Sequence, residues 1–204
     1  MPKPLIAIVG RPNVGKSTFF NRLLSQRQSI VDAQEGITRD RIYGEMEWSG
    51  HALKFVDTGG YIPEDIDQFN AAVREQAQAA MSESDLVIFM VDGKQGPTSS
   101  DEALAHFVRK SNKPYLLVVN KCDGYKTDEL TYQFHEFGLD TPIPISALNG
   151  RLTGDLLDLI LDKLDMSNQP FLDVNESCLR LSIVGMPNVG KSSLTNSLLQ
   201  KDRA

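Results

Sequence analysis

The chain has 204 residues, enough for one ordinary domain and a remainder. Its 41% hydrophobic and 24% charged residues are typical of a folded globular protein and exclude a disordered one. The formal net charge of −6 argues against a general DNA- or RNA-binding protein, because such proteins need clustered Lys and Arg.

The cysteine count and the apolar runs indicate where in the cell the protein is located. Two cysteines, Cys122 and Cys178, are too few for a disulfide framework or a four-thiolate metal site. The longest apolar run, residues 86–91, is far shorter than the roughly 20 residues that span a bilayer, and the N-terminus has no signal pattern. We therefore expect a cytoplasmic protein with neither a membrane nor a DNA partner.

Short apolar runs alternate with stretches of helical periodicity along most of the chain. The pattern predicts strands at 5–9, 42–48, 52–56, 86–91, 115–119 and 142–145, with a hairpin turn at residues 49–51. It predicts helices at 15–24, 69–81, 101–109, 130–137 and 152–164. Such alternation is typical of the α/β class, here a mostly parallel six-stranded sheet with helices on both faces.

An internal repeat organises the chain. Residues 4–27 recur at an offset of 175 as residues 179–202, with 12 of 24 aligned positions identical. Between the copies, residues 165–178 contain three acidic residues, one proline and no Lys or Arg, which is typical of a linker. We expect a first domain over 1–164, an acidic linker over 165–178, and the opening strand, loop and helix of a truncated second domain over 179–204.

A phosphate-binding motif, GxxxxGK[ST], lies between the first predicted strand and the first predicted helix. Backbone N–H groups of such a loop surround phosphate oxygens, and its glycines allow close approach. We expect Lys16 to reach the β- and γ-phosphates and Ser17 to ligate Mg²⁺. The residues expected at the nucleotide are Gly10, Arg11, Pro12, Asn13, Val14, Gly15, Lys16, Ser17 and Thr18.

A carboxylate follows the predicted strand 52–56, at the edge of a parallel sheet where ligands bind. The segment is Asp57-Thr58-Gly59-Gly60. We expect Asp57 to hold Mg²⁺ through water and the Gly60 N–H to sense the γ-phosphate.

Base selection is predicted for Asn120-Lys121-Cys122-Asp123, which follows the strand 115–119. Guanine presents two adjacent donors that one carboxylate, Asp123, can accept together, and adenine does not. After the next strand, Ser146-Ala147-Leu148 completes the expected base site, with the Ala147 N–H on the guanine oxygen.

These motifs, in this order over residues 5–164, resemble the translation-factor-type GTPase superfamily. The two GxPNVGKS loops, the acidic linker and Gly36-Ile37-Thr38-Arg39-Asp40 resemble the bacterial double-Era GTPase family, EngA or Der. The resemblance implies a P-loop NTPase fold with a Ras-like G domain, hydrolysis of GTP to GDP and phosphate, and a switch role in assembly of the large ribosomal subunit. That family carries an RNA-binding C-terminal domain, which we expect to be absent from this chain.

Catalytic roles follow from the same resemblance. It implies that Thr38 completes the Mg²⁺ shell and contacts the γ-phosphate. Ras-type enzymes place a glutamine after DxxG to orient water, but Tyr61 stands here, as in hydrophobic-substituted GTPases. In related GTPases an asparagine at the position of Asn13 helps to bind K⁺ beside the phosphates, although Asn13 has the alternative of simply stabilising the turn. For Arg39 we expect a solvated side chain or a salt bridge rather than catalysis.

The second loop is expected to be silent, with at best weak phosphate binding, because its Mg²⁺ and base partners do not follow it. Its residues are Gly185, Asn188, Gly190, Lys191 and Ser192. Catalysis is expected from Lys16, Thr38, Gly60 and Asn13. The alternative is a nucleotide-sensing module with vestigial hydrolysis. An ATP-dependent phosphotransferase is opposed by the base motif.

Overall fold

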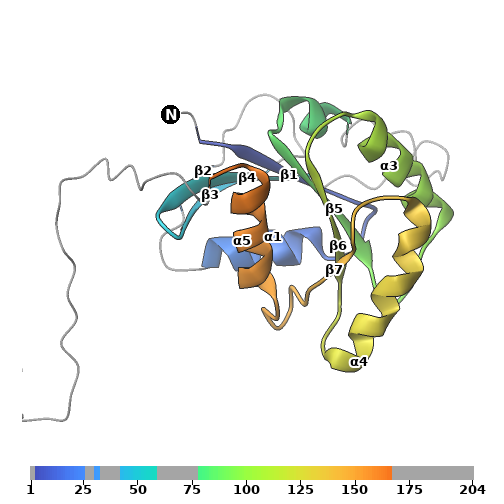
Figure 1. Cartoon of the computed structure of the whole chain (residues 1–204). Helices are drawn as coiled ribbons and strands as arrows, with labels where there is room; N and C mark the ends of the chain where they lie inside the picture. The colour runs from blue at the N-terminus through green and yellow to red at the C-terminus, as the bar shows by residue number, and fades with distance from the viewer. Residues whose placement is uncertain (1–2, 26–29, 33–41, 59–77, 167–204) are drawn as a thin grey trace, which may run out of the picture. The chain divides into compact units, whose positions relative to one another are not determined.

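A computed structural model describes residues 3–25, 30–32, 42–58 and 78–166 (Figure 1). The chain divides into two compact units, Met1–Phe171 and Leu172–Ala204, and every described residue belongs to the first. The second phosphate-binding loop, most of the predicted linker and most of the helix predicted at 69–81 therefore lie outside the described residues. So do Thr38, Arg39, Gly59, Gly60 and Tyr61.

The described residues form a mixed sheet with the strand order β2-β3-β4-β1-β5-β6-β7. Strands β1, β4, β5, β6 and β7 are mutually parallel, and β3 pairs antiparallel with both β2 and β4. The bounds are β1 Leu5–Val9, β2 Ile30–Asp32, β3 Ile42–Trp48, β4 His51–Asp57, β5 Leu86–Asp92, β6 Tyr115–Asn120 and β7 Ile143–Pro144. All six predicted strands are present, so the predicted fold class is confirmed.

Two details of the sheet differ from the prediction. The edge strand β2 is a seventh strand of three residues, too short to stand out as an apolar run. His51 belongs to β4 rather than to the turn, because it pairs with Trp48. The hairpin turn is therefore only Ser49 and Gly50, whose φ values of 47° and 79° are those of a two-residue turn that matches strand twist.

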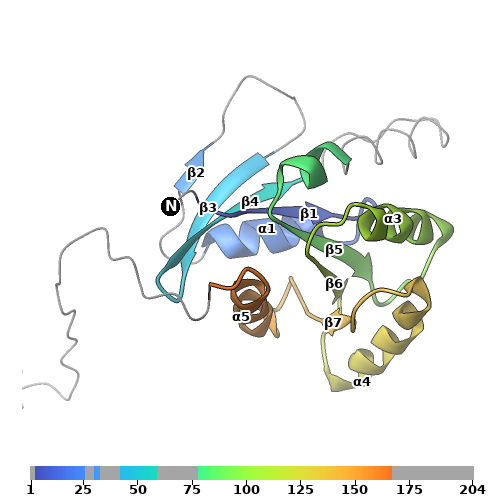
Figure 2. The same cartoon turned by 45° about the horizontal axis from the view of Figure 1, so that its top comes forward.

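Helices cover both faces of the sheet (Figure 2). On one face α1 (Lys16–Ser25) and α5 (Thr153–Lys163) pack against Ile6 and Ile8 of β1. On the other, α3 (Ser99–Lys110) and the 3₁₀ helix η1 (Glu129–Phe137) pack against Ala7 and Val9. Because successive residues of a strand point to opposite faces, β1 serves both cores.

The helices near predicted positions show two corrections. α3 starts two residues before the predicted start because Thr98, the residue before the helix, and Asp101, in its first turn, form a capping box. The helix predicted at 130–137 is η1, preceded by the one-turn α4 (Tyr125–Asp128). The buried residues of η1, Thr131, Phe134 and Phe137, recur every three positions, which matches three residues per turn. Of the helix predicted at 69–81, the structure describes only the last part, and residues 78–83 are helical.

The parallel strands bring the predicted motifs to one edge. The segments after β1, β4, β5, β6 and β7 all leave the carboxyl edge of the sheet, where ligands of open α/β sheets bind. The phosphate-binding loop, Asp57, the base motif and Ser146 lie at or just after the ends of four of these strands. The fold thus gathers them from four separate stretches of sequence.

Candidate nucleotide site

The loop between β1 and α1 needs its glycines because neighbouring groups leave no room for side chains. A Cβ on Gly10 would lie 2.2 Å from the Met90 carbonyl oxygen. A Cβ on Gly15, which has a φ of 101°, would lie 2.2 Å from Asn120 Nδ2. The loop therefore packs its backbone directly on β5 and on the base motif.

Lys16 is buried at the start of α1, and its ammonium group is held by the loop itself. Nζ donates to the Gly10 and Arg11 carbonyl oxygens, both at 2.9 Å. Burial lowers the pKa of Lys16 to about 8, with Asp57 opposing and Arg11 reinforcing this shift. A phosphate beside Nζ would supply the negative charge that this buried cation lacks.

Two of the residues expected at Mg²⁺, Ser17 and Asp57, are in direct contact. Ser17 Oγ donates to Asp57 Oδ2 at 2.6 Å, across the junction of α1 and β4. Next to Asp57, Thr58 Oγ1 donates to the Ile8 carbonyl oxygen at 2.8 Å, which ties the end of β4 to β1. A hydroxyl and a carboxylate are hard oxygen ligands of the kind Mg²⁺ takes, alongside water and substrate phosphates, so these residues fit the ion.

Asn120 connects the phosphate end of the site to the base end. Its Nδ2 donates to the Val14 carbonyl oxygen at 2.8 Å, and its Oδ1 accepts from the Ala147 N–H at 2.9 Å. The side chain is buried, so both contacts are shielded from water. The Ala147 N–H therefore already has a protein partner, and its predicted contact with guanine stays a prediction.

Lys121 has the same bridging role on the solvent side. Its Nζ donates to the Asn13 carbonyl oxygen at 2.8 Å and to Asp92 Oδ2 at 2.6 Å. Although burial opposes it, hydrogen bonding from Lys121 and from the Gln95 and Lys94 N–H groups lowers the pKa of Asp92. Sequence reasoning missed Asp92, yet the signal was there, since it ends an apolar strand as Asp57 does.

The carboxylate of Asp123 is oriented by three side chains. Oδ1 accepts from Ser146 Oγ at 2.7 Å and from Asn149 Nδ2 at 3.4 Å, while Oδ2 accepts from Lys94 Nζ at 2.6 Å. The Lys94 and Ser146 hydrogen bonds hold the pKa of Asp123 below its usual range. An ionised, oriented carboxylate can accept two adjacent donors, as the base prediction requires. Lys94 and Asn149 belong to no motif, so only the fold reveals them.

Asn13 and Arg11 complete the described part of the loop. Asn13 is exposed and has a φ of 65°, a conformation that asparagine tolerates well. Arg11 turns toward α3, where its Nε donates to Asp101 Oδ2 at 3.0 Å. Its side chain therefore fixes the loop to α3, a role that the motif did not indicate.

A phosphate-binding loop after the first strand, a carboxylate beside its serine and a base motif after β6 define a P-loop nucleotide-binding domain of the GTPase type. The chain belongs to the family described as 50S ribosome-binding GTPases, whose model matches residues 5–121 and 180–204.

Curated relatives agree with the predicted resemblance to the Der family, which is confirmed. The chain is 47% identical over 203 residues to GTPase Der of Clostridium novyi and 48% identical over 204 residues to that of Halothermothrix orenii. In both cases the match covers 100% of this chain and 46% of the relative, so the chain spans about half the length of these proteins.

Solved structures agree on the fold. The Era protein of Aquifex aeolicus, bound to GDP and AlF₄⁻, is 34% identical, with a TM-score of 0.63 over 80% of this chain and 57% of that one. An Era complex with MgGDPNP and a segment of 16S ribosomal RNA is also 34% identical, with a TM-score of 0.64 and the same coverage. Among the described residues, no helix is both long and apolar enough to cross a membrane.

Proposed function

We propose that this chain binds GTP with Mg²⁺ and hydrolyses it to GDP and phosphate, as a slow switch enzyme. The observation that carries the proposal is the convergence of Lys16, the Ser17–Asp57 pair and Asp123 on one edge of the sheet. Era relatives at 34% identity have been solved with GDP and AlF₄⁻ and with MgGDPNP, which supports the same ligand class here.

At the phosphate end, Lys16 is the cation for the β- and γ-phosphates and the loop N–H groups bind their oxygens. Ser17 would hold Mg²⁺ directly and Asp57 through water, after their mutual hydrogen bond opens. Bound Mg²⁺ supplies charge neutralisation at the β- and γ-phosphate oxygens. Thr38 and the Gly60 N–H are proposed to contact the γ-phosphate and to relax after hydrolysis.

At the base end, Asp123 selects guanine by accepting its two adjacent donors. Lys94 and Ser146 keep this carboxylate ionised and oriented before the base arrives. Asn120 joins this end to the phosphate-binding loop. The distance between the base site and the phosphate site is therefore fixed before the nucleotide binds. ATP is disfavoured because adenine lacks the two adjacent donors that the Asp123 carboxylate accepts from guanine.

Hydrolysis forms a bond between a water oxygen and the γ-phosphorus and breaks the bond to the β–γ bridging oxygen, which leaves with GDP. No glutamine follows Gly60, so we propose that the backbone orients the attacking water in its place. We also propose that a K⁺ ion near Asn13 supplies the positive charge that an arginine finger supplies in other GTPases. Such charge stabilisation is worth on the order of 10³ to 10⁵ in rate.

The cellular role proposed here comes from the relatives. We propose a role in assembly of the large ribosomal subunit, in the cytoplasm, and membership of the family of 50S ribosome-binding GTPases supports the ribosomal part of this role. We propose residues 1–164 as the catalytic G domain, 165–178 as a linker, and 179–204 as the start of a second G domain. The phosphate-binding loop within residues 179–204 would at best bind phosphate weakly, so nucleotide titration should give one tight site.

Phosphate release tests the proposal directly. The wild-type chain should release phosphate from GTP and not from ATP, and Lys16→Ala should remove both release and nucleotide binding. Lys110→Ala is the matched control, because Lys110 is an exposed lysine at the far end of α3. Tight GTP binding without phosphate release would favour the nucleotide-sensing alternative, and equal use of ATP would contradict the base assignment.

A further inference from the structure

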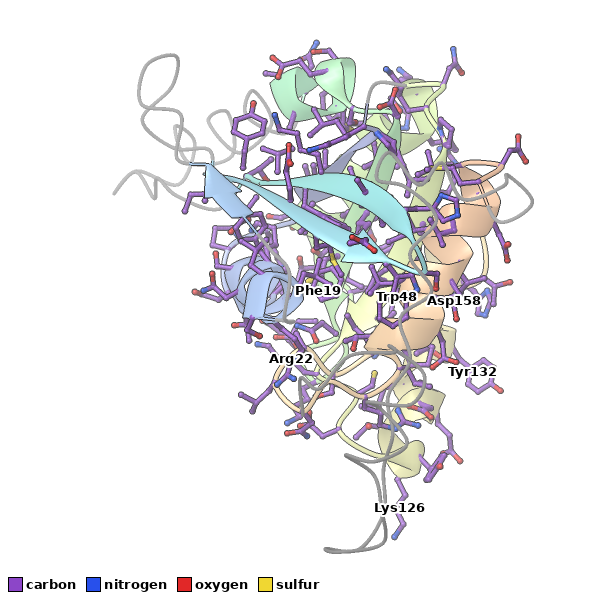
Figure 3. The ribbon with its side chains drawn as sticks, turned by 90° about the vertical axis from the view of Figure 1, so that its left-hand side faces the viewer. Phe19, Arg22, Trp48, Lys126, Tyr132 and Asp158 are labelled. Atoms are coloured by element: carbon purple, nitrogen blue, oxygen red, sulfur yellow. The ribbon has the colours of Figure 1, made fainter. Side chains whose placement is uncertain are left out.

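Arg22 connects the phosphate helix to the base loop through hydrogen bonds that no motif predicts. It lies in the last turn of α1, the helix that begins with Lys16 and Ser17. Its Nε donates to the Ala147 carbonyl oxygen and its Nη2 to the Leu148 carbonyl oxygen, 125 and 126 residues along the chain. Figure 3 shows Arg22 between α1 and the segment that leads to α5.

The guanidinium group suits this task because its donors form a rigid planar fork. Two adjacent carbonyl groups bound to one fork fix two successive peptide planes. The Arg22 side chain lies close against the loop at Gly150. An added Cβ there would lie 2.8 Å from Arg22 Nη1, and the φ of Gly150 is 78°. Any other residue at position 150 would strain the backbone at this φ and would require the end of the Arg22 side chain to shift.

A chain of hydrogen bonds leads from Arg22 to the carboxylate that reads the base. The peptide whose carbonyl oxygen Arg22 binds at Leu148 carries the N–H of Asn149, which donates to Ser146 Oγ at 3.2 Å. Ser146 Oγ then donates to Asp123 Oδ1 at 2.7 Å. Because a peptide is planar, fixing its oxygen also fixes the direction of its N–H.

We propose that Arg22 is a positioning residue for guanine recognition. It holds residues 146–150 in the conformation that orients Asp123 and thereby sets the distance between the base end and the phosphate end of the site. The inference rests on the proposed function, since it assumes that Asp123 reads guanine. Its specific consequence is that loss of Arg22 weakens base discrimination and leaves phosphate binding intact.

Binding of GDP, IDP and pyrophosphate, measured by calorimetry, separates these effects. Hypoxanthine lacks the exocyclic amine of guanine, so the ratio of the IDP and GDP dissociation constants reports the second hydrogen bond to Asp123. Arg22→Met keeps the aliphatic stem and removes the fork. We expect it to lower that ratio by about ten-fold, the scale of one hydrogen bond to a charged group. Pyrophosphate affinity should be unchanged.

Two further variants keep the test decisive. Arg22→Lys keeps the charge with a single donor group and should give an intermediate ratio, even if Arg22→Met folds poorly. Asn21→Ala changes an exposed neighbour on the same helix and should leave the ratio at the wild-type value.

The outcomes distinguish three situations. A lower ratio with unchanged pyrophosphate binding supports the proposal. An unchanged ratio in both Arg22 variants, with or without a lower unfolding temperature, overturns it and leaves Arg22 a structural residue only. Wild-type protein that binds GDP and IDP equally would instead overturn the proposed role of Asp123, whatever the Arg22 variants do.

Discussion

The Ser17 hydroxyl donates a 2.6 Å hydrogen bond to Asp57 Oδ2, which joins the first turn of α1 to the end of β4. Forty residues separate the two in sequence. The contact places a hydroxyl and a carboxylate where a magnesium ion beside phosphate would need them.

Replacing Ser17 should therefore uncouple nucleotide binding from Mg²⁺. We expect Mg²⁺ to tighten GTP binding to the wild-type chain at least about ten-fold, and Ser17→Ala to remove most of that gain, because a direct oxygen ligand is lost. Titration with and without EDTA measures this. Ser25→Ala, at the other end of α1, is the control. Full Mg²⁺ dependence in Ser17→Ala would contradict the assignment.

Lys16 predicts a pH-dependent stability for the nucleotide-free chain. Its pKa is about 8 in the folded chain, against an ordinary value of 10.5, because burial disfavours the charge. Below pH 8 the charged form is buried at full cost, and this cost disappears as pH rises from 8 to 10.5. Lys16→Met should then be more stable than wild type at pH 7 by up to about 3 kcal/mol.

Urea unfolding at several pH values measures the difference between the two proteins. The stability gap should narrow between pH 8 and 10.5, while Lys110→Met should show no such gap. A gap that stays constant over this range would show that the Lys16 pKa is not lowered.

The proposed K⁺ site predicts a cation effect on turnover. Replacing Na⁺ by K⁺ should speed phosphate release by about ten-fold or more, given the rate contribution of such a charge. Asn13→Gly tests the side chain cleanly, because glycine tolerates the φ of 65°. This variant should bind GDP normally and lose the K⁺ effect.

Asn112→Gly is the matched control, since Asn112 also has a positive φ, of 53°, and lies in an exposed turn. If Asn13 only stabilises the turn, Asn13→Gly will keep the response to K⁺ that wild type has. That result, or no K⁺ response in the wild type, would rule out the proposed site.

The sequence was sufficient to predict the strands and the motifs they present, because apolar runs and glycine-rich spacing are local signals. The end of β3 and the start of β4 were placed within one residue, whereas β2 was missed because a three-residue edge strand forms by pairing with β3. The capping box that starts α3 was visible in the sequence, as Thr98 followed by Asp101, and was overlooked.

Much of the site could not be predicted, because its contacts join distant segments. Arg22 carries no motif signal, yet it binds two carbonyl groups of the base loop. Lys94 pairs with Asp123 only because the ends of β5 and β6 are neighbours in the sheet. Asp92, which ends a strand as Asp57 does, was the one such residue with a usable signal.

The most direct test of guanine recognition is the binding of GDP and XDP to the wild-type chain and to Asp123→Asn. Xanthine has an oxygen acceptor where guanine has the exocyclic amine, so an asparagine amide should pair with it and the carboxylate should not. Asp140→Asn, an exposed surface change, is the control. We predict that wild type prefers GDP by at least about a hundred-fold and that Asp123→Asn reverses the preference. Undiminished GDP affinity in Asp123→Asn would contradict the account.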